Sequence, residues 1–245
     1  MRGRLLPLFG LLLMSSSSLF PQAYPRWFLD QGSLGCDGLV VGYTRSSYYR
    51  DSSLVLAVRN GYENHARLLE TRVSGGQAFW TTEGGTFWLG ADFKEEYNLV
   101  ASESAPSRLT VLDSFIDGNL SAALLGSTGC HLENDARRFM AVPASPPAWT
   151  EVMPSDDRYH YGVGLATSYF YEVSSWLEAE RIARRNIARS LLIEIKALEK
   201  STAREGQQIR GEEVAVTLRN LQVVARWRDV GKQIFYVLVR MPKLH

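Results

Sequence analysis

The sequence predicts an α+β protein in which one domain, a long helix packed on an antiparallel sheet, occurs twice in tandem. The first observation is that residues 25–69 align with residues 147–191 at a constant shift of 122, without a gap. The second is that each copy contains apolar residues at helical spacing. The third is that each copy ends in two short apolar runs around a turn, the pattern of a β-hairpin. Identical residues at the 45 aligned positions include, in the first copy, Pro25, Trp27, Val41, Gly42, Ser46, Tyr49, Ser53, Ala57, Arg59, Asn64, Ala66, Arg67 and Leu69.

The ends of the two copies align as well. Residues 109–117 match residues 221–229 at a shift of 112, with identities at Leu109, Val111 and Asp117. The first copy therefore carries about ten more residues between its halves, and each copy has an ordinary domain size. The expected organisation is a leader at 1–23, a first domain at 25–142, a linker at 143–146 and a second domain at 147–245.

Residues 1–23 have the composition of a secretory signal peptide. Arg2 and Arg4 give a positive start, residues 5–14 are mostly apolar, and small residues follow up to Ala23. The apolar run is shorter than the ~20 residues that span a bilayer. The alternatives are a short core helix and an uncleaved anchor. With the signal peptide, we expect an exported protein.

The two cysteines of an exported chain predict one disulfide, Cys36 to Cys130. It would close nearly the whole first copy. Arg158 stands where the second copy would need its counterpart of Cys36. An alternative is a lipidated Cys36, because residues 33–36 resemble a lipoprotein cleavage site. Cleavage there would remove Trp27, which we expect in the core.

Glycines mark the first strand of each copy. Gly162 and Gly164 resemble part of a dinucleotide-binding loop, but the third glycine is absent and no acidic residue ends a following strand at the expected distance. We interpret them as positions of close backbone approach. The expected elements are strands at 38–44, 161–166 and 213–219, helices at 53–73 and 175–199, and hairpins at 110–125 and 222–240.

The second predicted helix carries arginines on the faces away from its apolar stripe. Such a basic surface could meet a partner or anionic lipid headgroups. The alternative is a solvated face balanced by Glu178 and Glu180, with Glu180 and Arg184 at the favourable spacing of four. The arginines are Arg181, Arg184, Arg185 and Arg189.

Two aromatic pairs flank a Glu-Gly-Gly turn in the first copy and predict a further hairpin. They could bind an envelope ligand such as a glycan or peptide, or they could pack under the hairpin. The residues are Phe79, Trp80, Phe87 and Trp88.

Composition and motifs exclude several classes of function. The net charge of +1 does not indicate a nucleic-acid-binding protein. The four histidines, His65, His131, His160 and His245, have no cysteine, carboxylate pair or serine at catalytic or metal-ligand spacing. We expect no catalytic residue, no metal and no cofactor.

The order of motifs resembles the LPP-twenty lipoprotein domain family. The residues that carry the resemblance are Pro-x-Trp, Gly-Val-Gly-x-Ala at 162–166, an Ala/Arg-rich helix, Val-Val-x-x-Trp-x-Asp at 223–229 and Tyr-Val-Leu-Val-Arg at 236–240. The resemblance covers residues 147–241, and residues 25–125 resemble a degenerate second copy. Related domains occur in flagellar assembly protein T and in outer-membrane basal-disk proteins. A convincing lipid-bearing cysteine is missing here.

This resemblance implies a non-enzymatic periplasmic structural subunit of a ring or scaffold around a flagellar motor or an envelope secretion machine. The implied partners are other envelope or motor proteins and further copies of the chain in a homo-oligomeric ring, with peripheral membrane contact. The location that the resemblance implies is the periplasm, at the inner face of the outer membrane. The alternative is a soluble periplasmic binding module that uses the aromatic hairpin of the first copy.

Overall fold

The computed structural model describes the backbone of residues 23–36, 38–82, 85–202 and 212–243, and their side chains except those of 76–92 and 194–214. It is a mixed α+β fold with antiparallel sheets. Residues 1–22 of the predicted signal peptide lie outside the described residues. The strands are β1 (Ala23–Pro25), β2 (Val40–Arg45), β3 (Glu70–Thr82), β4 (Gly85–Tyr97), β5 (Leu109–Ile116), β6 (Leu120–Ser127), β7 (Phe139–Ala141), β8 (Tyr159–Thr167), β9 (Glu212–Arg219), β10 (Gln222–Asp229) and β11 (Ile234–Pro242). The helices are α1 (Arg26–Leu29), α2 (Arg50–Leu69), α3 (Leu99–Ser104) and α4 (Glu172–Thr202), with short 3₁₀ turns at Gln31–Ser33, Ala105–Ser107, Asn134–Arg137 and Ala148–Thr150.

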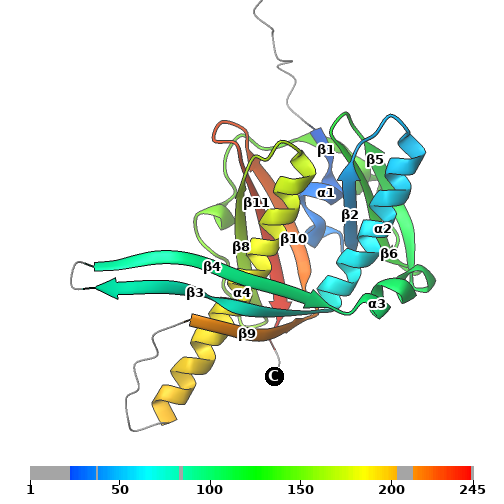
Figure 1. The fold of residues 1–245 in the computed structure, drawn as a ribbon. Helices are drawn as coiled ribbons and strands as arrows, with labels where there is room; N and C mark the ends of the chain where they lie inside the picture. Colours follow the sequence, from blue (N-terminus) through cyan, green and yellow to red (C-terminus); the bar gives the residue numbers. More distant parts are fainter. Residues whose placement is uncertain (1–22, 37, 83–84, 203–211, 244–245) are drawn as a thin grey trace, which may run out of the picture.

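Two sheets have the same strand order. One runs β2-β6-β5 and the other β8-β11-β10, with α2 against the first and α4 against the second (Figure 1). We call β2, α2, β5 and β6 the first unit, and β8, α4, β10 and β11 the second unit. Both units carry a β-bulge at matching places, between Val111 and Asp113 in β5 and between Val223 and Ala225 in β10. A bulge bends its strand and increases the local twist, so the two hairpins curve at the same point.

Each unit brings its helix into backbone contact with its first strand at a glycine. A Cβ placed on Gly42 would lie 2.1 Å from the carbonyl oxygen of Ala57, and one on Gly164 would lie 1.8 Å from that of Ala179. No other residue type fits at such a distance. These contacts confirm the predicted close backbone approach at Gly164.

An asparagine fixes each helix along its strand. The side-chain amide of Asn64 donates to the carbonyl of Val41 (2.9 Å), and that of Asn186 donates to the carbonyl of Val163 (2.8 Å). Both pairs are related by the shift of 122. The hydrogen bond lies next to the glycine contact and holds the helix in register with the strand.

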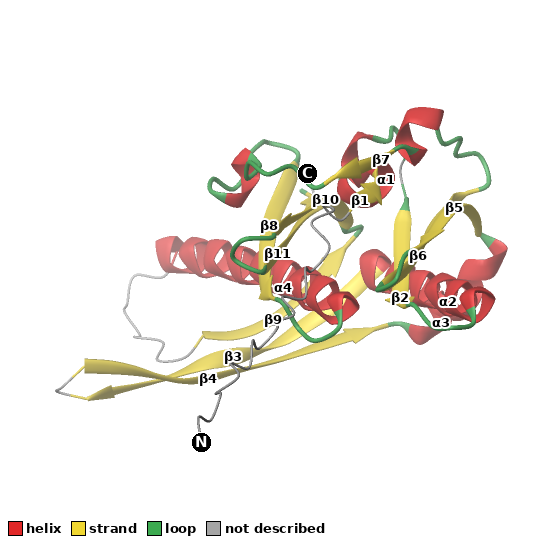
Figure 2. Cartoon of the chain, turned by 90° about the horizontal axis from the view of Figure 1, so that it is seen from above, coloured by secondary structure: helices red, strands yellow, loops and turns green. Residues whose placement is uncertain are grey.

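The third sheet, β4-β3-β9, combines segments from both halves of the chain. The helix expected to reach Val73 ends at Leu69, and Glu70 already has extended dihedrals. The prediction was wrong because Thr71 and Val73, both buried, alternate with exposed Arg72 as in a strand. Strand β9 pairs with β3 rather than with the sheet of the second unit. Beyond residue 77, β4 is the only strand paired with β3 among the described residues, and this hairpin leaves the body of the molecule (Figure 2).

The segment from β1 to α1 fills the space between the two units. Strand β1 pairs with β7, and Trp27 is fully buried, as expected. The ring of Phe28 lies 5.6 Å from that of Trp176 in α4 and 6.1 Å from that of Tyr43 in β2, both edge to face. Most buried residues of the two units consequently belong to one continuous hydrophobic core, while Val163, Trp227, Tyr236 and Leu238 of the second unit form a separate cluster.

The predicted disulfide is present and joins Cys36 to Cys130, with 94 residues of sequence separation. Closing a loop of this length restricts the unfolded chain and contributes roughly 4 kcal/mol in the chain-entropy model. The bond ties the loop before β2 to the segment after β6. It thus stabilises the two ends of the first unit against each other.

We expect the Gly164→Ala substitution to destabilise the protein by at least about 2 kcal/mol, because the new methyl group would displace the backbone of α4. The measurement is urea unfolding followed by circular dichroism. Gly129→Ala is the matched control, since nothing lies within 4 Å of a Cβ at Gly129. Equal stability of the two variants would contradict the close contact.

Candidate functional site

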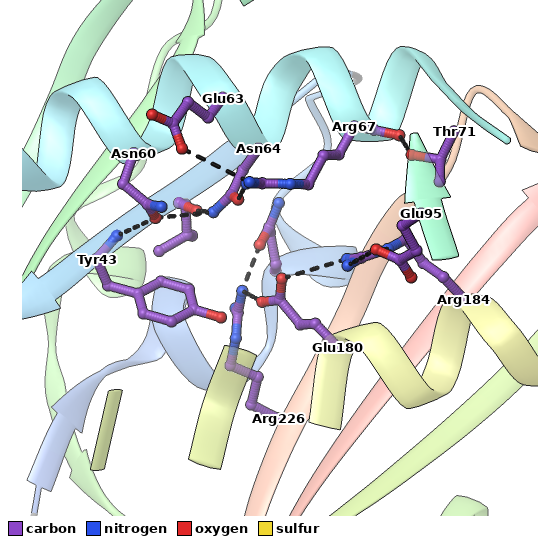
Figure 3. A network of polar contacts seen from close by, with 12 residues as sticks. Tyr43, Asn60, Glu63, Asn64, Arg67, Thr71, Glu95, Glu180, Arg184 and Arg226 are labelled. Carbon is purple, nitrogen blue, oxygen red and sulfur yellow. Dashed lines mark hydrogen bonds and ion pairs between the residues drawn. The ribbon is translucent and has the colours of Figure 1, made fainter. Parts of the chain in front are cut away.

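The most unusual feature of the interior is a chain of buried charges where the two units meet. Its centre is Arg226 of β10, whose side chain is fully buried. Its guanidinium donates to the carbonyl of Phe28 (3.0 Å) and to the carboxylate of Glu180 (2.7 Å), and it stacks 4.8 Å from the centre of the Phe28 ring. Arg226 therefore joins β10, α4 and α1 at one point (Figure 3).

Glu180 continues the chain of charges towards β4. Its second carboxylate oxygen lies 3.9 Å from Arg184, one turn further along α4, and Arg184 pairs with Glu95 of β4 at 2.7 Å. Burial disfavours the charged form of Arg184, yet the carboxylates of Glu95 and Glu180 hold its pKa above the ordinary value. Two cations thus alternate with two anions, so the charges balance within the network.

A second polar group lies on α2, beside this chain. Asn60 accepts from the backbone N–H of Tyr43 (3.0 Å), and Arg67 donates to Asn64 (2.8 Å) and to the Tyr97 hydroxyl (3.0 Å). Thr71, at the start of β3, donates to the carbonyl of Arg67 (2.6 Å). These contacts hold the base of the β3–β4 hairpin against the end of α2 (Figure 3).

We call the region where the two units and the segment from β1 to α1 meet the junction. Glu172, the first residue of α4, anchors its other end. Its carboxylate accepts from the Tyr24 hydroxyl (2.5 Å) and from the indole N–H of Trp176 (3.0 Å), and it lies 3.9 Å from Arg228. Burial, and then the charge of Glu172, raise the pKa of the Tyr24 phenol well above its ordinary value. Tyr24 therefore stays protonated and acts as a hydrogen-bond donor between β1 and α4.

The geometry of the junction suits a structural role. Each charged group of the chain from Arg226 to Glu95 contacts an opposite charge. The side chains of Glu95, Glu180, Arg184 and Arg226 line none of the four principal cavities of the described residues. Within the same residues, no group of three or more His, Cys, Asp or Glu side chains could hold a metal ion. The network binds α4 and β10 of the second unit to β4 and to α1, and its contact with the first unit is the Tyr43 ring, 5.7 Å from the Arg226 guanidinium.

The four arginines of the predicted basic surface on α4 differ in their exposure. Arg181 is half-exposed and pairs with Glu178 (2.7 Å), whereas Arg184 is buried, and the expectation that it faces a partner or solvent was wrong. Arg185 is half-buried, with its guanidinium 4.6 Å from the centre of the Phe93 ring, and Arg189 is half-buried. The reason is that α4 has two covered faces, one against β8 and one against β4.

The predicted aromatic hairpin exists in the backbone. Phe79 is opposite Trp88 and Trp80 is opposite Phe87 in the register of β3 and β4. The side chains of these four residues lie outside the described part of the chain, so their use as a ligand site stays a prediction.

Sequence reasoning missed the junction, although it noted Glu180 beside Arg184. The signal that could have found it is a difference between the copies. Where the second unit has Glu180, Arg184 and Arg226, the first unit has Val58, Tyr62 and Ser114 at the corresponding positions. Charges at positions that are apolar or small in the other copy indicate an interface rather than a shared fold requirement.

Comparison with known proteins adds no relative: no family model, curated protein or solved structure matches this chain. Among the described residues, no helix has the length and apolar character needed to cross a membrane.

Replacing Glu180 by Gln should destabilise the protein by roughly 3–5 kcal/mol, because Arg226 would remain buried without its carboxylate. The double variant Glu180→Leu/Arg226→Met should lose less than the sum of its single variants, which chemical unfolding would measure. Glu178→Gln on the same helix is the control, since its ion pair with Arg181 is near solvent and contributes ~0–1 kcal/mol. Equal losses for Glu180→Gln and Glu178→Gln would contradict the role of the network.

Stability should fall as the pH rises above about 10, the pKa of an unfolded tyrosine. Because burial raises the pKa of Tyr24 in the folded state, the folded protein keeps this proton after the unfolded chain has lost it. The stabilisation is complete below about pH 10 and decreases by up to about 1.4 kcal/mol per pH unit above it. Tyr24→Phe should reduce this slope in unfolding curves measured at alkaline pH, while Tyr48→Phe, at an exposed position, should not. An unchanged slope in Tyr24→Phe would refute the prediction.

Proposed function

We propose that the protein is a non-enzymatic structural subunit that works outside the cytoplasm, in a ring or scaffold around a flagellar motor or an envelope secretion machine. The observation that carries the proposal is the β3–β4 hairpin. Strand β4 extends over Gly85–Tyr97, 13 residues, and stands at the edge of its sheet. An exposed edge strand offers unpaired backbone groups to another chain, and a hairpin that leaves the body can reach a neighbouring copy.

We also propose that the two units are tandem copies of one domain. Matching strand order, matching bulges and the equivalent contacts of Gly42 with Gly164 and of Asn64 with Asn186 support a duplication. The continuous core, with the buried network beside it, then holds the two copies together. A rigid body is what a repeating assembly needs, since each subunit must present its contacts at a constant angle.

The proposed location rests on the disulfide and on the composition of residues 1–23. A bond between Cys36 and Cys130 is typical of an oxidising compartment. The choice of a motor or secretion machine rests on the resemblance of residues 147–241 to the LPP-twenty lipoprotein domain. The same resemblance is the ground for expecting further copies of the chain and other envelope proteins as partners.

The decisive variant replaces residues 76–92 by an Asn-Gly turn, which joins the strands where Gly75 faces Phe93 and keeps most of the pairing with β9. We expect the complete protein to form discrete oligomers in light scattering and electron microscopy. The shortened protein should be monomeric, with an unchanged thermal unfolding midpoint.

The control for this experiment is Tyr48→Ala, in the loop between β2 and α2, away from the hairpin (Figure 1). It should leave the oligomer intact. A complete protein that stays monomeric at all concentrations, together with normal motors in a deletion strain, would overturn the proposed function. Oligomers that persist without residues 76–92 would contradict the role of the hairpin in assembly.

A further inference from the structure

Two loops at one end of the molecule expose an unusual number of aromatic rings. One loop, residues 46–49, connects β2 to α2, and the other, residues 168–171, connects β8 to α4 (Figure 1). We call them the aromatic loops. Tyr48 and Phe170 are 94% and 91% exposed, although a large ring gains most from burial. The other exposed rings are those of Tyr49, Tyr169 and Tyr171.

The aromatic loops occupy equivalent positions in the two units. At the shift of 122, Tyr48 corresponds to Phe170 and Tyr49 to Tyr171. Within each loop the two rings meet edge to face, with centroids 5.4 Å apart for Tyr48–Tyr49 and 4.8 Å apart for Phe170–Tyr171. A single solvent-facing ring can occur by chance. An exposed aromatic pair at equivalent positions of both units needs another explanation.

Hydrogen bonds hold both loops in a fixed shape. The Ser53 hydroxyl accepts from the backbone N–H of Ser47 (2.9 Å), and the Ser175 hydroxyl accepts from that of Tyr169 (2.8 Å). The loops are also joined to each other, because Arg45 donates to the Tyr171 hydroxyl (2.9 Å) and stacks 4.3 Å from the centre of its ring. Preorganised groups lose little entropy on binding, so the rings are available to a ligand without a folding step.

A cavity of about 390 Å3 opens between the aromatic loops. This volume lies within the ~300–1,000 Å3 range of small-ligand sites. The polar residues that line it include Arg45, Ser46, Asn119 and Ser168, and Phe170 lines it as well. A wider and shallower cleft, lined by Tyr48, shares Arg45, Ser46 and Gly118 with the cavity and continues it towards the first unit.

This combination points to the chemical class of the ligand. A β-linked sugar ring presents flat C–H faces that pack on aromatic rings, and hydroxyl groups around its edge that need hydrogen-bond donors and acceptors. The aromatic loops supply the rings, and the guanidinium, amide and hydroxyl groups of the cavity supply the hydrogen bonds. Two adjoining hollows that share Arg45, Ser46 and Gly118 suit a chain of sugars rather than a single one.

Charge favours this ligand over an anionic membrane surface. A polybasic patch attracts anionic lipid, but the three arginines of the two hollows, Arg45, Arg50 and Arg228, stand beside two carboxylates, those of Asp117 and Glu172. Polar groups in a recess, rather than on a flat face, also suit an inserted ligand. We propose that the aromatic loops and the cavity between them form a binding site for a β-linked oligosaccharide. The site does not depend on the assembly role proposed above.

The experiment is calorimetric titration of the complete protein with two soluble probes, an oligomer of β-linked N-acetylglucosamine and a cello-oligosaccharide. We expect saturable binding of at least one probe. Tyr48→Ala and Phe170→Ala should each weaken it roughly tenfold, which corresponds to about 1.4 kcal/mol. Both side chains are almost fully exposed, so both variants should fold as the parent does. Phe139→Ala, which removes an exposed ring outside the cavity, should bind as the parent does.

Failure of both probes to bind would overturn the proposal. So would binding that Tyr48→Ala and Phe170→Ala leave unchanged in folded protein. Sedimentation with phosphatidylglycerol vesicles, without binding of either saccharide, would assign the aromatic loops to a membrane surface instead and would equally reject the saccharide site. None of these outcomes affects the oligomer measurement, so the two proposals fail separately.

Discussion

One buried guanidinium, that of Arg226, sets the arrangement of the two units. A buried arginine cannot lose its proton, so its charge must be balanced where it lies. Glu180 supplies the balance, and the carbonyl of Phe28 and the ring of Tyr43 complete the surroundings. Because these partners come from α4, α1 and β2, satisfying one charge fixes the second unit, the N-terminal segment and the first unit together. Another orientation of the units would take the Phe28 carbonyl and the Tyr43 ring away from this guanidinium, while its pair with Glu180 lies within the second unit.

The two units share a backbone plan but contribute different chemistry to their junction. The second unit provides Arg226, Glu180 and Arg184, while the first unit provides the ring of Tyr43, α1 provides the carbonyl of Phe28, and β4 provides Glu95. A symmetric pair of units would place like charges opposite each other, which costs free energy. The substitution of charges at positions equivalent to Val58, Tyr62 and Ser114 removes this symmetry. Similar units can then pack face to face in only one way.

The sequence predicted the parts of the fold that depend on local pattern. The strand and hairpin segments, the two long helices and the Cys36–Cys130 bond follow from periodicity, turn residues and export. Patterns local to one copy carry no information about pairing between copies, so the position of β9 beside β3 could not be derived. The burial of Arg184 could not be predicted for the same reason. Helical periodicity identifies the face that packs on the helix's own sheet, but not a second face covered by β4.

The junction also connects the β3–β4 hairpin to the end of the molecule that carries the aromatic loops. Glu95 lies near the base of the β3–β4 hairpin, and the chain of charges runs from it through α4 to Arg226 in β10. Two residues further along β10, Arg228 borders the cavity between the aromatic loops. A force on the hairpin is therefore resisted by buried ion pairs and by one continuous core, rather than by a flexible linker. Because the body is rigid, an assembly contact at the hairpin and a ligand at the loops can act at the same time, and each can change without altering the other.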